Sequence, residues 1–494
     1  MAPGFTKPAE LFDRDVEWSE LSAFASNPAL GASLGLMYGR RRQGKTMLLE
    51  LLAEVSGGFY FTGLQQSSKL NLGRLSQAYG AFTGRSDVPV QFQSWEQALG
   101  ALLALGQDAP VPIILDEFGY LMEKEPALPS VLQALLSPRG AARTATRGRL
   151  LICGSAISVM KALLAGPAPL RGRATLEMLV HPFGYRDAAA YWGLDGQWEA
   201  AFKMHALVGG TPAYRDFAGG DVPDSSSDIE RWVPATLLNP SSAFFREGRI
   251  LLEEESEISD DALYWSVLTA IADGNTRRGQ IASMIGRPNT ALGHPLTVLT
   301  DTQLITKHED ALKLKRATFH IAEPILRFRQ LIIEPNENRL TRRRGQQVWE
   351  QSTDTVSSRI YGPHFEQLAR EWTQDASADT LGGQVGRVGS SVIDCAACTQ
   401  THEIDVVALA KNPHSAERVI AIGEAKWRAT PVGIAELNRL THIGDVVTRA
   451  HASAAHLQVL LFSGGGFTPD LRQAATASDG RVQLVDLGRL YTGN

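Results

Sequence analysis

One short segment, GRRRQGKT at Gly39–Thr46, constrains the fold of this chain more than any other. It fits the pattern G-x-x-x-x-G-K-[ST] in full, and it lies between an apolar run at 34–38 and helix-forming residues at 47–53. That order predicts a strand, a glycine-rich loop and a helix. The glycines let the backbone wrap around phosphates, and the start of the helix presents free N–H groups to the anion.

The same motif predicts which groups would hold a nucleotide. We expect Lys45 to reach the β and γ phosphates of ATP and Thr46 to ligate Mg²⁺. The whole loop would contribute to nucleotide binding, namely Gly39, Arg40, Arg41, Arg42, Gln43, Gly44, Lys45 and Thr46. A chance loop is the alternative, and the strand and helix patterns on either side argue against it.

A second motif supplies two adjacent acids, Asp116 and Glu117, directly after an apolar strand pattern at 111–115. There Asp116 would hold the Mg²⁺ shell, and Glu117 would orient or deprotonate the attacking water. Adjacent acids after a strand also occur in ordinary solvated turns. Their position downstream of a complete phosphate-binding loop favours the functional interpretation.

Two further positions near this predicted sheet leave alternatives open. Ser155 follows the apolar run at 150–153, and it either senses the γ-phosphate or simply ends the strand. Arg171 or Arg173 could meet phosphate from the same or a neighbouring subunit. For these arginines we favour the alternative, a solvated loop.

Length, charge and cysteine content bound the class of protein. At roughly 100–200 residues per domain, 494 residues predict about three domains. The net charge of −5 provides no overall attraction to nucleic acid, so any such surface must be local. Three cysteines indicate a reducing compartment, and no apolar run reaches the ~18–20 residues of a membrane span. The N-terminus also lacks the order of a signal peptide, so we expect a cytoplasmic protein with no membrane partner.

Alternation of short apolar runs with helical patterns between about 30 and 220 predicts an α/β fold with a parallel sheet. The expected domains are, in order, a P-loop NTPase core with a helical extension at 1–254, a winged helix-turn-helix at 255–334, a polar linker at 335–356 and a second α/β domain at 357–494.

The middle domain predicts a nucleic-acid-binding fold. It shows three helical patterns and then two short strands, near 304–307 and 312–315. Lys and Arg outnumber Asp and Glu there, which suits contacts to phosphates. The expected recognition helix, Pro288–Thr300, carries no Lys or Arg, so we expect little base-specific recognition from it. We favour DNA binding, and the alternative is a winged helix used for packing or protein contact.

Three charged residues lie within apolar strand patterns of the last domain. Asp405 interrupts one pattern, and Glu424 and Lys426 lie two residues apart in the next, which places them on one face. Charges are costly in buried strands, so this group predicts either a site or an ion pair. Glu366 lies beside the apolar face of an amphipathic helix predicted at 361–372.

The order of motifs resembles that of a known family. The strand with GRRRQGKT, the LDE strand end, CGSAISVM, the LRGR turn before HPFGYRDA, and HALVGGTPAY are similar to segments of the archaeal-type ATPases. That family is a branch of the STAND class of AAA-related P-loop NTPases. The resemblance covers roughly residues 10–330. It implies a winged helix after the ATPase core, often a C-terminal restriction-endonuclease-like domain, and a possible homo-oligomer.

The predicted αβββαβ order of the last domain, with its D…E-x-K pattern, resembles the PD-(D/E)xK nucleases. By that resemblance Asp405 and Glu424 would ligate Mg²⁺, and Lys426 would position or activate water and stabilise the pentavalent charge. Glu366 would be an outer ligand of the metal. Ile404 stands where the family's leading proline is found. The alternative is a buried salt bridge in an inactive relative of the fold.

The segment Cys395-Ala-Ala-Cys398, followed by His402, could begin a zinc site. A structural zinc site needs about four ligands, and the chain has no second Cys pair. We therefore expect a β-hairpin tip that carries two reduced thiols.

Together these features predict an NTPase that binds and hydrolyses ATP with Mg²⁺ and is coupled to nucleic acid, DNA above all. Metal-dependent cleavage of that nucleic acid would be its output. The alternative is an ATP-switched DNA-binding regulator or scaffold with an inactive nuclease-like domain.

Overall fold

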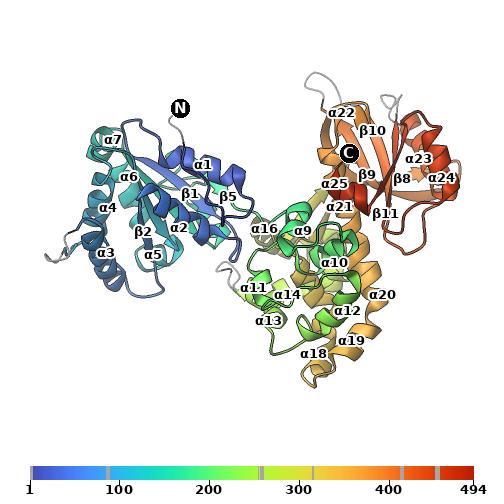
Figure 1. Ribbon diagram of the computed structural model, residues 1–494, viewed down its shortest axis with the longest axis horizontal. Coiled ribbons are helices and arrows are strands. Elements are labelled where there is room, and N and C mark those ends of the chain that lie inside the picture. The colour runs from blue at the N-terminus through green and yellow to red at the C-terminus, as the bar shows by residue number, and fades with distance from the viewer. Residues whose placement is uncertain are drawn as a thin grey trace. The chain divides into compact units, whose positions relative to one another are not determined.

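The computed structural model describes residues 4–84, 90–253, 255, 261–313, 316–411, 417–450 and 457–493. The chain forms two compact units (Figure 1). The first contains the residues up to Pro182 together with Thr211–Ala213, and the second contains Phe183–Gly210, Tyr214–Glu253 and the residues from 261 on. This division differs from the boundary expected at 254, because the helices after Pro182 share the apolar core of the second unit. None of the described helices is long and apolar enough to cross a membrane.

A five-stranded parallel sheet forms the first unit, with the strand order β2-β3-β4-β1-β5. The strands are β1 (Ser33–Tyr38), β2 (Phe59–Thr62), β3 (Val111–Asp116), β4 (Gly148–Gly154) and β5 (Ala174–Leu179). Strands β1, β3 and β4 are buried along almost their whole length, which explains their nearly continuous apolar sequences. The predicted α/β fold with a parallel sheet is confirmed.

Helices cover both faces of this sheet. Helices α1 and α2 pack in one apolar cluster, and α3 to α6 and α8 pack in another. Their bounds are α1 Asp15–Ala25, α2 Lys45–Ser56, α3 Ser68–Phe82, α4 Trp95–Ala104, α5 Phe118–Lys124, α6 Leu128–Leu135, α7 Ala141–Ala145 and α8 Ile157–Ala162. The carboxyl ends of parallel strands meet at one edge of a sheet, so the loop after β1 and the acids after β3 come together there.

Helices also begin the second unit. They are α9 (Tyr185–Trp192), α10 (Trp198–Val208), α11 (Tyr214–Phe217), α12 (Ser226–Ala235) and α13 (Ala243–Glu253). Three more helices and a hairpin follow: α14 (Asp261–Ala272), α15 (Arg278–Met284), the 3-10 turn η1 (Asn289–Leu292), α16 (Gly293–Asp301), and the antiparallel strands β6 (Ile305–Glu309) and β7 (Ala317–Ile321). The second strand lies further along the chain than the expected 312–315, of which 314–315 fall outside the described residues.

The segment at 335–356, expected to be a polar linker, is helical instead. The helical run comprises α17 (Pro324–Phe328), the π-helix η2 (Arg329–Ile333), α18 (Glu334–Leu340), α19 (Gly345–Gln351), α20 (Thr353–Thr355) and the π-helix η3 (Val356–Tyr361). Leu340, Val348 and Trp349 of this segment are buried in the core of the second unit. A few apolar residues at helical spacing are enough to anchor short helices in a core. The average composition of the segment is polar because most of its residues lie on the solvated faces of these helices, and that average suggested a linker.

A mixed five-stranded sheet, ordered β12-β11-β10-β9-β8, ends the chain. Strands β8, β9 and β10 pair antiparallel, and β10, β11 and β12 pair parallel. The elements are α21 (Gly362–Asp375), α22 (Ala378–Leu381), β8 (Val385–Cys395), β9 (Gln400–Ala410), β10 (Val419–Lys426), α23 (Ile434–Ala450), β11 (Gln458–Ser463), α24 (Pro469–Thr476), β12 (Val482–Asp486) and α25 (Leu487–Thr492). Helix α21 packs against β8, β9 and β10, and helices α23 and α24 contribute to a separate apolar cluster with the sheet.

Candidate functional site

The glycine-rich loop lies between β1 and α2, as its sequence predicts. A Cβ atom at Gly39 would lie 2.5 Å from the carbonyl oxygen of Val180, so any side chain there is excluded. Gly44 adopts a left-handed φ of 85° immediately before α2 begins at Lys45. The buried side chain of Gln43 lies against Gly39 inside the loop. The loop is therefore compact, and it directs the first N–H groups of α2 to one place.

The side chain of Lys45 is buried within this loop. Its ammonium donates hydrogen bonds of 2.7 Å to each of the carbonyl oxygens of Gly39 and Arg40. Burial lowers the pKa of Lys45, and the negative charges of Glu117 and Asp116 oppose that effect. A cation held among carbonyl oxygens inside a loop of backbone N–H groups is suited to an anionic ligand.

Asp116, at the end of β3, connects the loop to the neighbouring strands. Its Oδ2 atom accepts hydrogen bonds of 3.0 Å from the Thr46 hydroxyl and of 3.0 Å from the Tyr60 hydroxyl. Its Oδ1 atom accepts a 2.8 Å hydrogen bond from the backbone N–H of Glu117. The two residues predicted to share a Mg²⁺ ion, Thr46 and Asp116, are thus brought into direct contact.

Glu117 follows with a left-handed φ of 50°, which is uncommon for a residue with a side chain. Its Oε1 atom accepts a 3.1 Å hydrogen bond from the hydroxyl of Ser155, just beyond the end of β4. The structure therefore brings Ser155 next to the predicted catalytic carboxylate. Arg171 and Arg173 instead donate to the backbone oxygens of Gly166 and Leu136, which agrees with the solvated-loop alternative.

Two residues of this site were not anticipated from the sequence. Tyr60, on β2, donates to the same oxygen of Asp116 as Thr46 does, and burial raises the pKa of Tyr60. Arg14 is buried, and its guanidinium donates to the carbonyl oxygens of Gln43 at 3.2 Å and His181 at 2.8 Å. Both act across long sequence separations, and no local motif around either residue signals the contact.

The charged residues of the last domain form a second candidate site. Asp405 lies on β9, Glu424 and Lys426 lie on β10, and Glu366 lies on α21. Burial, and then the charge of Glu424, raise the pKa of Asp405. Burial, and then the charge of Asp405, raise the pKa of Glu366 to about 7. Asp405 is therefore close enough to be repelled by Glu424 and to repel Glu366, and such a group of carboxylates is typical of a site that holds a cation.

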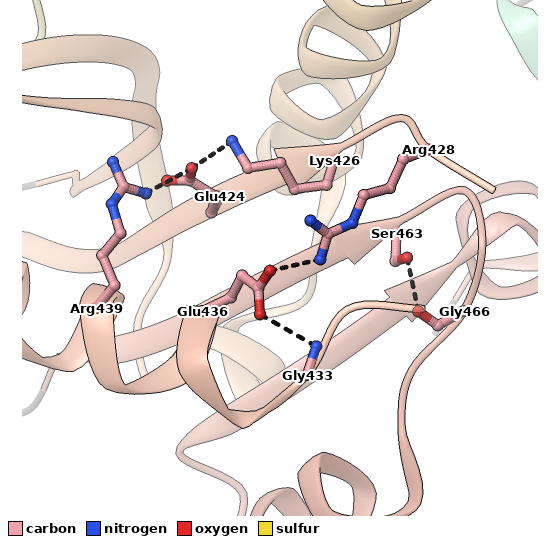
Figure 2. Close-up of polar contacts among 8 residues, drawn as sticks. All are labelled: Glu424, Lys426, Arg428, Gly433, Glu436, Arg439, Ser463 and Gly466. Carbon is pink, nitrogen blue, oxygen red and sulfur yellow. Dashed lines mark hydrogen bonds and ion pairs between the residues drawn. The ribbon is translucent and has the colours of Figure 1, made fainter. Parts of the chain in front are cut away.

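Hydrogen bonds keep two of these carboxylates in place, and Figure 2 shows those of Glu424. The Oδ2 atom of Asp405 accepts a 2.9 Å bond from the backbone N–H of Ala425. The Oε1 atom of Glu424 accepts from Lys426 at 2.5 Å and from Arg439 of α23 at 2.6 Å. Arg439 was not anticipated from the sequence, because α23 and β10 come into contact only in the folded structure.

One buried oxygen of the cluster is left for a ligand. Glu424 is only 3% exposed, and its Oε2 atom has no hydrogen-bond partner among the described residues. An unpartnered carboxylate oxygen is costly when buried, and a metal ion would satisfy it. The donor set of Asp405, Glu424 and Glu366 consists of carboxylate oxygens, which suits Mg²⁺ or Mn²⁺. The residues present therefore fit the metal that the sequence predicted.

Exposed arginines also occur in the segment at 255–334, which was predicted to be a winged helix. Arg277, Arg278 and Arg287 are exposed around α15, and the Nε atom of Arg278 donates to the carbonyl oxygen of Asn289 at 2.9 Å. These side chains are available for phosphate contacts.

The turn after β6 is held by the C-terminal sheet. The N–H of Ala311 donates to the carbonyl oxygen of Ser390 at 2.9 Å, and the Ser391 hydroxyl donates to Asp310 at 2.6 Å. Asp310 and Ala311, just after β6, are therefore already engaged by β8.

Comparison with known families gives one partial match. A family model, DUF234, described as archaeal and bacterial proteins of unknown function, matches residues 330–438. That segment is less than half of the chain, and it includes Glu366, Asp405, Glu424 and Lys426. No curated protein matches the chain.

Several solved structures show distant likeness to the chain. The Aeropyrum pernix ORC2 protein in its ADPNP–ADP complexes has a TM-score of 0.43 and 16% identity, covering 71% of this chain and 97% of that one. CDC6P from Pyrobaculum aerophilum has a TM-score of 0.35 and 14% identity, covering 70% and 96%. The Aeropyrum pernix ORC1 protein in complex with DNA has a TM-score of 0.31 and 14% identity, covering 67% and 95%. Likenesses this distant do not assign an activity.

Proposed function

We propose that the first unit binds and hydrolyses ATP as an AAA-related P-loop NTPase. The observation that carries this proposal is the contact of Thr46 with Asp116, at 3.0 Å, beside the buried ammonium of Lys45. In the proposed complex, phosphate oxygens replace the carbonyl oxygens of Gly39 and Arg40 as partners of Lys45. Thr46 and Asp116 would hold Mg²⁺, which neutralises charge on the phosphates.

Glu117 is the proposed general base of hydrolysis. The Ser155 hydroxyl holds its Oε1 atom, so the other carboxylate oxygen is the one that would take a proton from the attacking water. The left-handed backbone at Glu117 turns this carboxylate away from the strand direction that Asp116 follows. Two adjacent acids thereby acquire different roles, one beside the metal and one beside the water.

We further propose that the C-terminal domain cleaves nucleic acid in the manner of the PD-(D/E)xK nucleases. The supporting observation is that Asp405, Glu424 and Lys426 are gathered from two strands with Glu366 from α21. Asp405 and Glu424 would hold Mg²⁺, which supplies activated water and charge neutralisation. Lys426, next to Glu424, would orient the water and balance the charge that develops on the phosphate. The segment at 255–334 would contact the nucleic acid as a winged helix.

One assay tests both proposals. The purified full-length protein is incubated with plasmid, linear duplex, single-stranded DNA and RNA in Mg²⁺ or Mn²⁺, with and without ATP, beside Lys45→Ala and Asp405→Ala. We expect ATP hydrolysis that is lost only in Lys45→Ala, and cleavage that is lost in Asp405→Ala. ATP hydrolysis that survives Lys45→Ala would refute the first proposal, and cleavage that survives Asp405→Ala would refute the second.

One observation favours a second candidate function. Lys426 and Arg439 both pair with the same oxygen of Glu424, as expected for a structural ion pair in an inert domain. The chain would then be an ATP-switched, DNA-binding regulator. Titration with Mn²⁺ separates the candidates, because a nuclease site binds the ion through Asp405 and Glu424. If wild type and Asp405→Ala bind Mn²⁺ equally, the regulator is the better candidate.

A further inference from the structure

Four soft metal-ligand side chains come together where the β8–β9 hairpin meets α23. They are Cys395, Cys398, His402 and His442, and their donor atoms all lie within 4.8 Å of one another. Cys395 ends β8, Cys398 lies in the turn, and His402 lies near the start of β9. The fourth residue, His442, comes from α23. It lies far from the other three along the chain, so the local sequence pattern suggested too few ligands.

The distances within this cluster suit a tetrahedral ion. The Sγ atom of Cys395 lies 3.5 Å from Nε2 of His442, and the Sγ atom of Cys398 lies 3.1 Å from Nε2 of His402. With zinc bonds of about 2.3 Å to sulfur and about 2.0–2.1 Å to nitrogen, tetrahedral geometry separates the two ligand atoms by about 3.5 Å. The cluster therefore needs only small movements to enclose an ion.

The surroundings of the four side chains also suit a structural metal. Cys395 and His402 are buried, and Cys398 and His442 are half-buried. All three cysteines of the chain are free thiols. Two thiolates and two imidazoles fill all four positions around zinc, which leaves none open for a substrate. The donor set differs from the all-carboxylate cluster at Asp405, so the two places would select different metals.

We propose that Cys395, Cys398, His402 and His442 bind one structural zinc ion. The ion would join the tip of the β8–β9 hairpin to α23, two elements that are otherwise linked through apolar packing. His442 lies three residues after Arg439, on the neighbouring turn of the same helix, and Arg439 donates to Glu424. Zinc would therefore hold α23 in the position that brings Arg439 to the candidate nuclease site. The proposal itself does not depend on nuclease activity.

The test is the metal content of untagged full-length protein, prepared without chelators and measured by inductively coupled plasma mass spectrometry. We expect about one zinc ion per chain in the wild type, as for other closed four-ligand sites. The variants Cys398→Ser and His442→Ala should lose the metal. The matched controls, Cys153→Ser on β4 and His294→Ala on α16, should retain it, because neither residue belongs to the cluster.

A second measurement guards against variants that fail to fold. Wild-type protein is stripped with a chelator and titrated with Co²⁺, whose visible absorption reports tetrahedral thiolate coordination. We expect that spectrum, its displacement by Zn²⁺, and a lower thermal midpoint for the stripped protein. Zinc content in the wild type no higher than in His442→Ala, together with no thiolate–cobalt absorption, would overturn the proposal. A Cys395–Cys398 disulfide in freshly purified protein, detected as a loss of two hydrogens in the intact mass, would also overturn it.

Discussion

The two candidate sites of this protein are built in contrasting ways. In the phosphate-binding loop, eight consecutive residues and two strand ends supply the predicted groups, and both oxygens of Asp116 have hydrogen-bond partners. In the C-terminal cluster, the carboxylates come from three separate elements, and one oxygen of Glu424 has no partner in the described part of the chain. Asp116 of the first site is therefore already held by hydrogen bonds, whereas Glu424 of the second keeps one buried oxygen that a cation would satisfy.

The contrast also concerns how charge is balanced. Lys45 is a buried cation that is influenced by two acids after β3, and burial lowers its pKa. In the C-terminal cluster, burial and mutual repulsion raise the pKa values of Asp405 and Glu366. A site that presents a cation is suited to an anionic phosphate, and a site with too many carboxylates is suited to a metal. If this comparison is correct, the two sites can be disabled independently.

The largest expected effect is on ATP turnover in Lys45→Ala. Removing the ammonium deletes the cation that donates to the carbonyl oxygens of Gly39 and Arg40 inside the loop, and we expect a loss of about 100-fold or more. Phosphate release from ATP measures it, and Mn²⁺ binding at the C-terminal cluster should not change. Arg171→Ala is the control, because that exposed side chain bonds only to its own loop. A near wild-type rate of ATP hydrolysis in Lys45→Ala would show that the loop is not the site of ATP turnover, and the comparison of the two sites would fail.

Next in size is the effect of Asp405→Asn on cleavage. The amide keeps the shape of the side chain and loses the charge that a metal needs, so we expect cleavage to fall about 100-fold or more while ATP hydrolysis is unchanged. A fluorescent duplex in Mg²⁺ provides the measurement. Equal loss of both activities would contradict the independence of the sites, and unchanged cleavage would exclude Asp405 as a metal ligand.

Acid should destabilise the second unit more than the first. In the second unit Nδ1 of His205 lies 3.0 Å from Nε2 of His364, and burial lowers the pKa of His205 to about 4 and that of His364 well below its ordinary value. Unfolded histidines bind protons as the pH falls below about 6.5, and these folded ones do not, so the stability present above pH 6.5 is lost between about 6.5 and 4. We expect a loss of about 2 kcal/mol by pH 5 from His205 alone, and a larger loss when His364 is included.

Hydrogen exchange followed by mass spectrometry measures this for each unit separately. The first unit contains one histidine, His181, so its protection should change less between pH 7.5 and pH 5. His364→Gln should weaken the pH dependence of the second unit, in which burial also lowers the pKa values of His308 and His320. Equal loss of protection in both units would show that the buried pair does not control the acid response.

The smallest expected effect separates two neighbouring arginines (Figure 2). Arg439 of α23 pairs with Glu424 of the carboxylate cluster. Arg428 pairs instead with Glu436, which also lies on α23 but does not belong to that cluster. Arg439→Ala removes a competing cation from Glu424, so we expect Mn²⁺ to bind about threefold to tenfold more tightly. Arg428→Ala should leave the affinity unchanged. Calorimetric titration measures both, and weaker binding in Arg439→Ala would show that the arginine supports the metal rather than competes with it.

The sequence predicted the parallel sheet, the loop between β1 and α2, and the position of Asp116, because each rests on the spacing of neighbouring residues. The alternating pattern likewise placed Glu424 and Lys426 on one strand. Average composition was a poorer guide, since it suggested a linker where Val348 and Trp349 anchor short helices.

The contacts that no local pattern could predict join residues far apart in the chain. Arg14 reaches His181, Arg439 reaches Glu424, and His442 completes the cluster begun by Cys395. The sequence by itself determined which residues are candidates for phosphate and metal binding, because backbone geometry translates short-range spacing directly into strands, loops and helix ends. Only the tertiary structure decided which of those groups meet, because long-range packing of helices on sheets, rather than spacing along the chain, sets the distances between them.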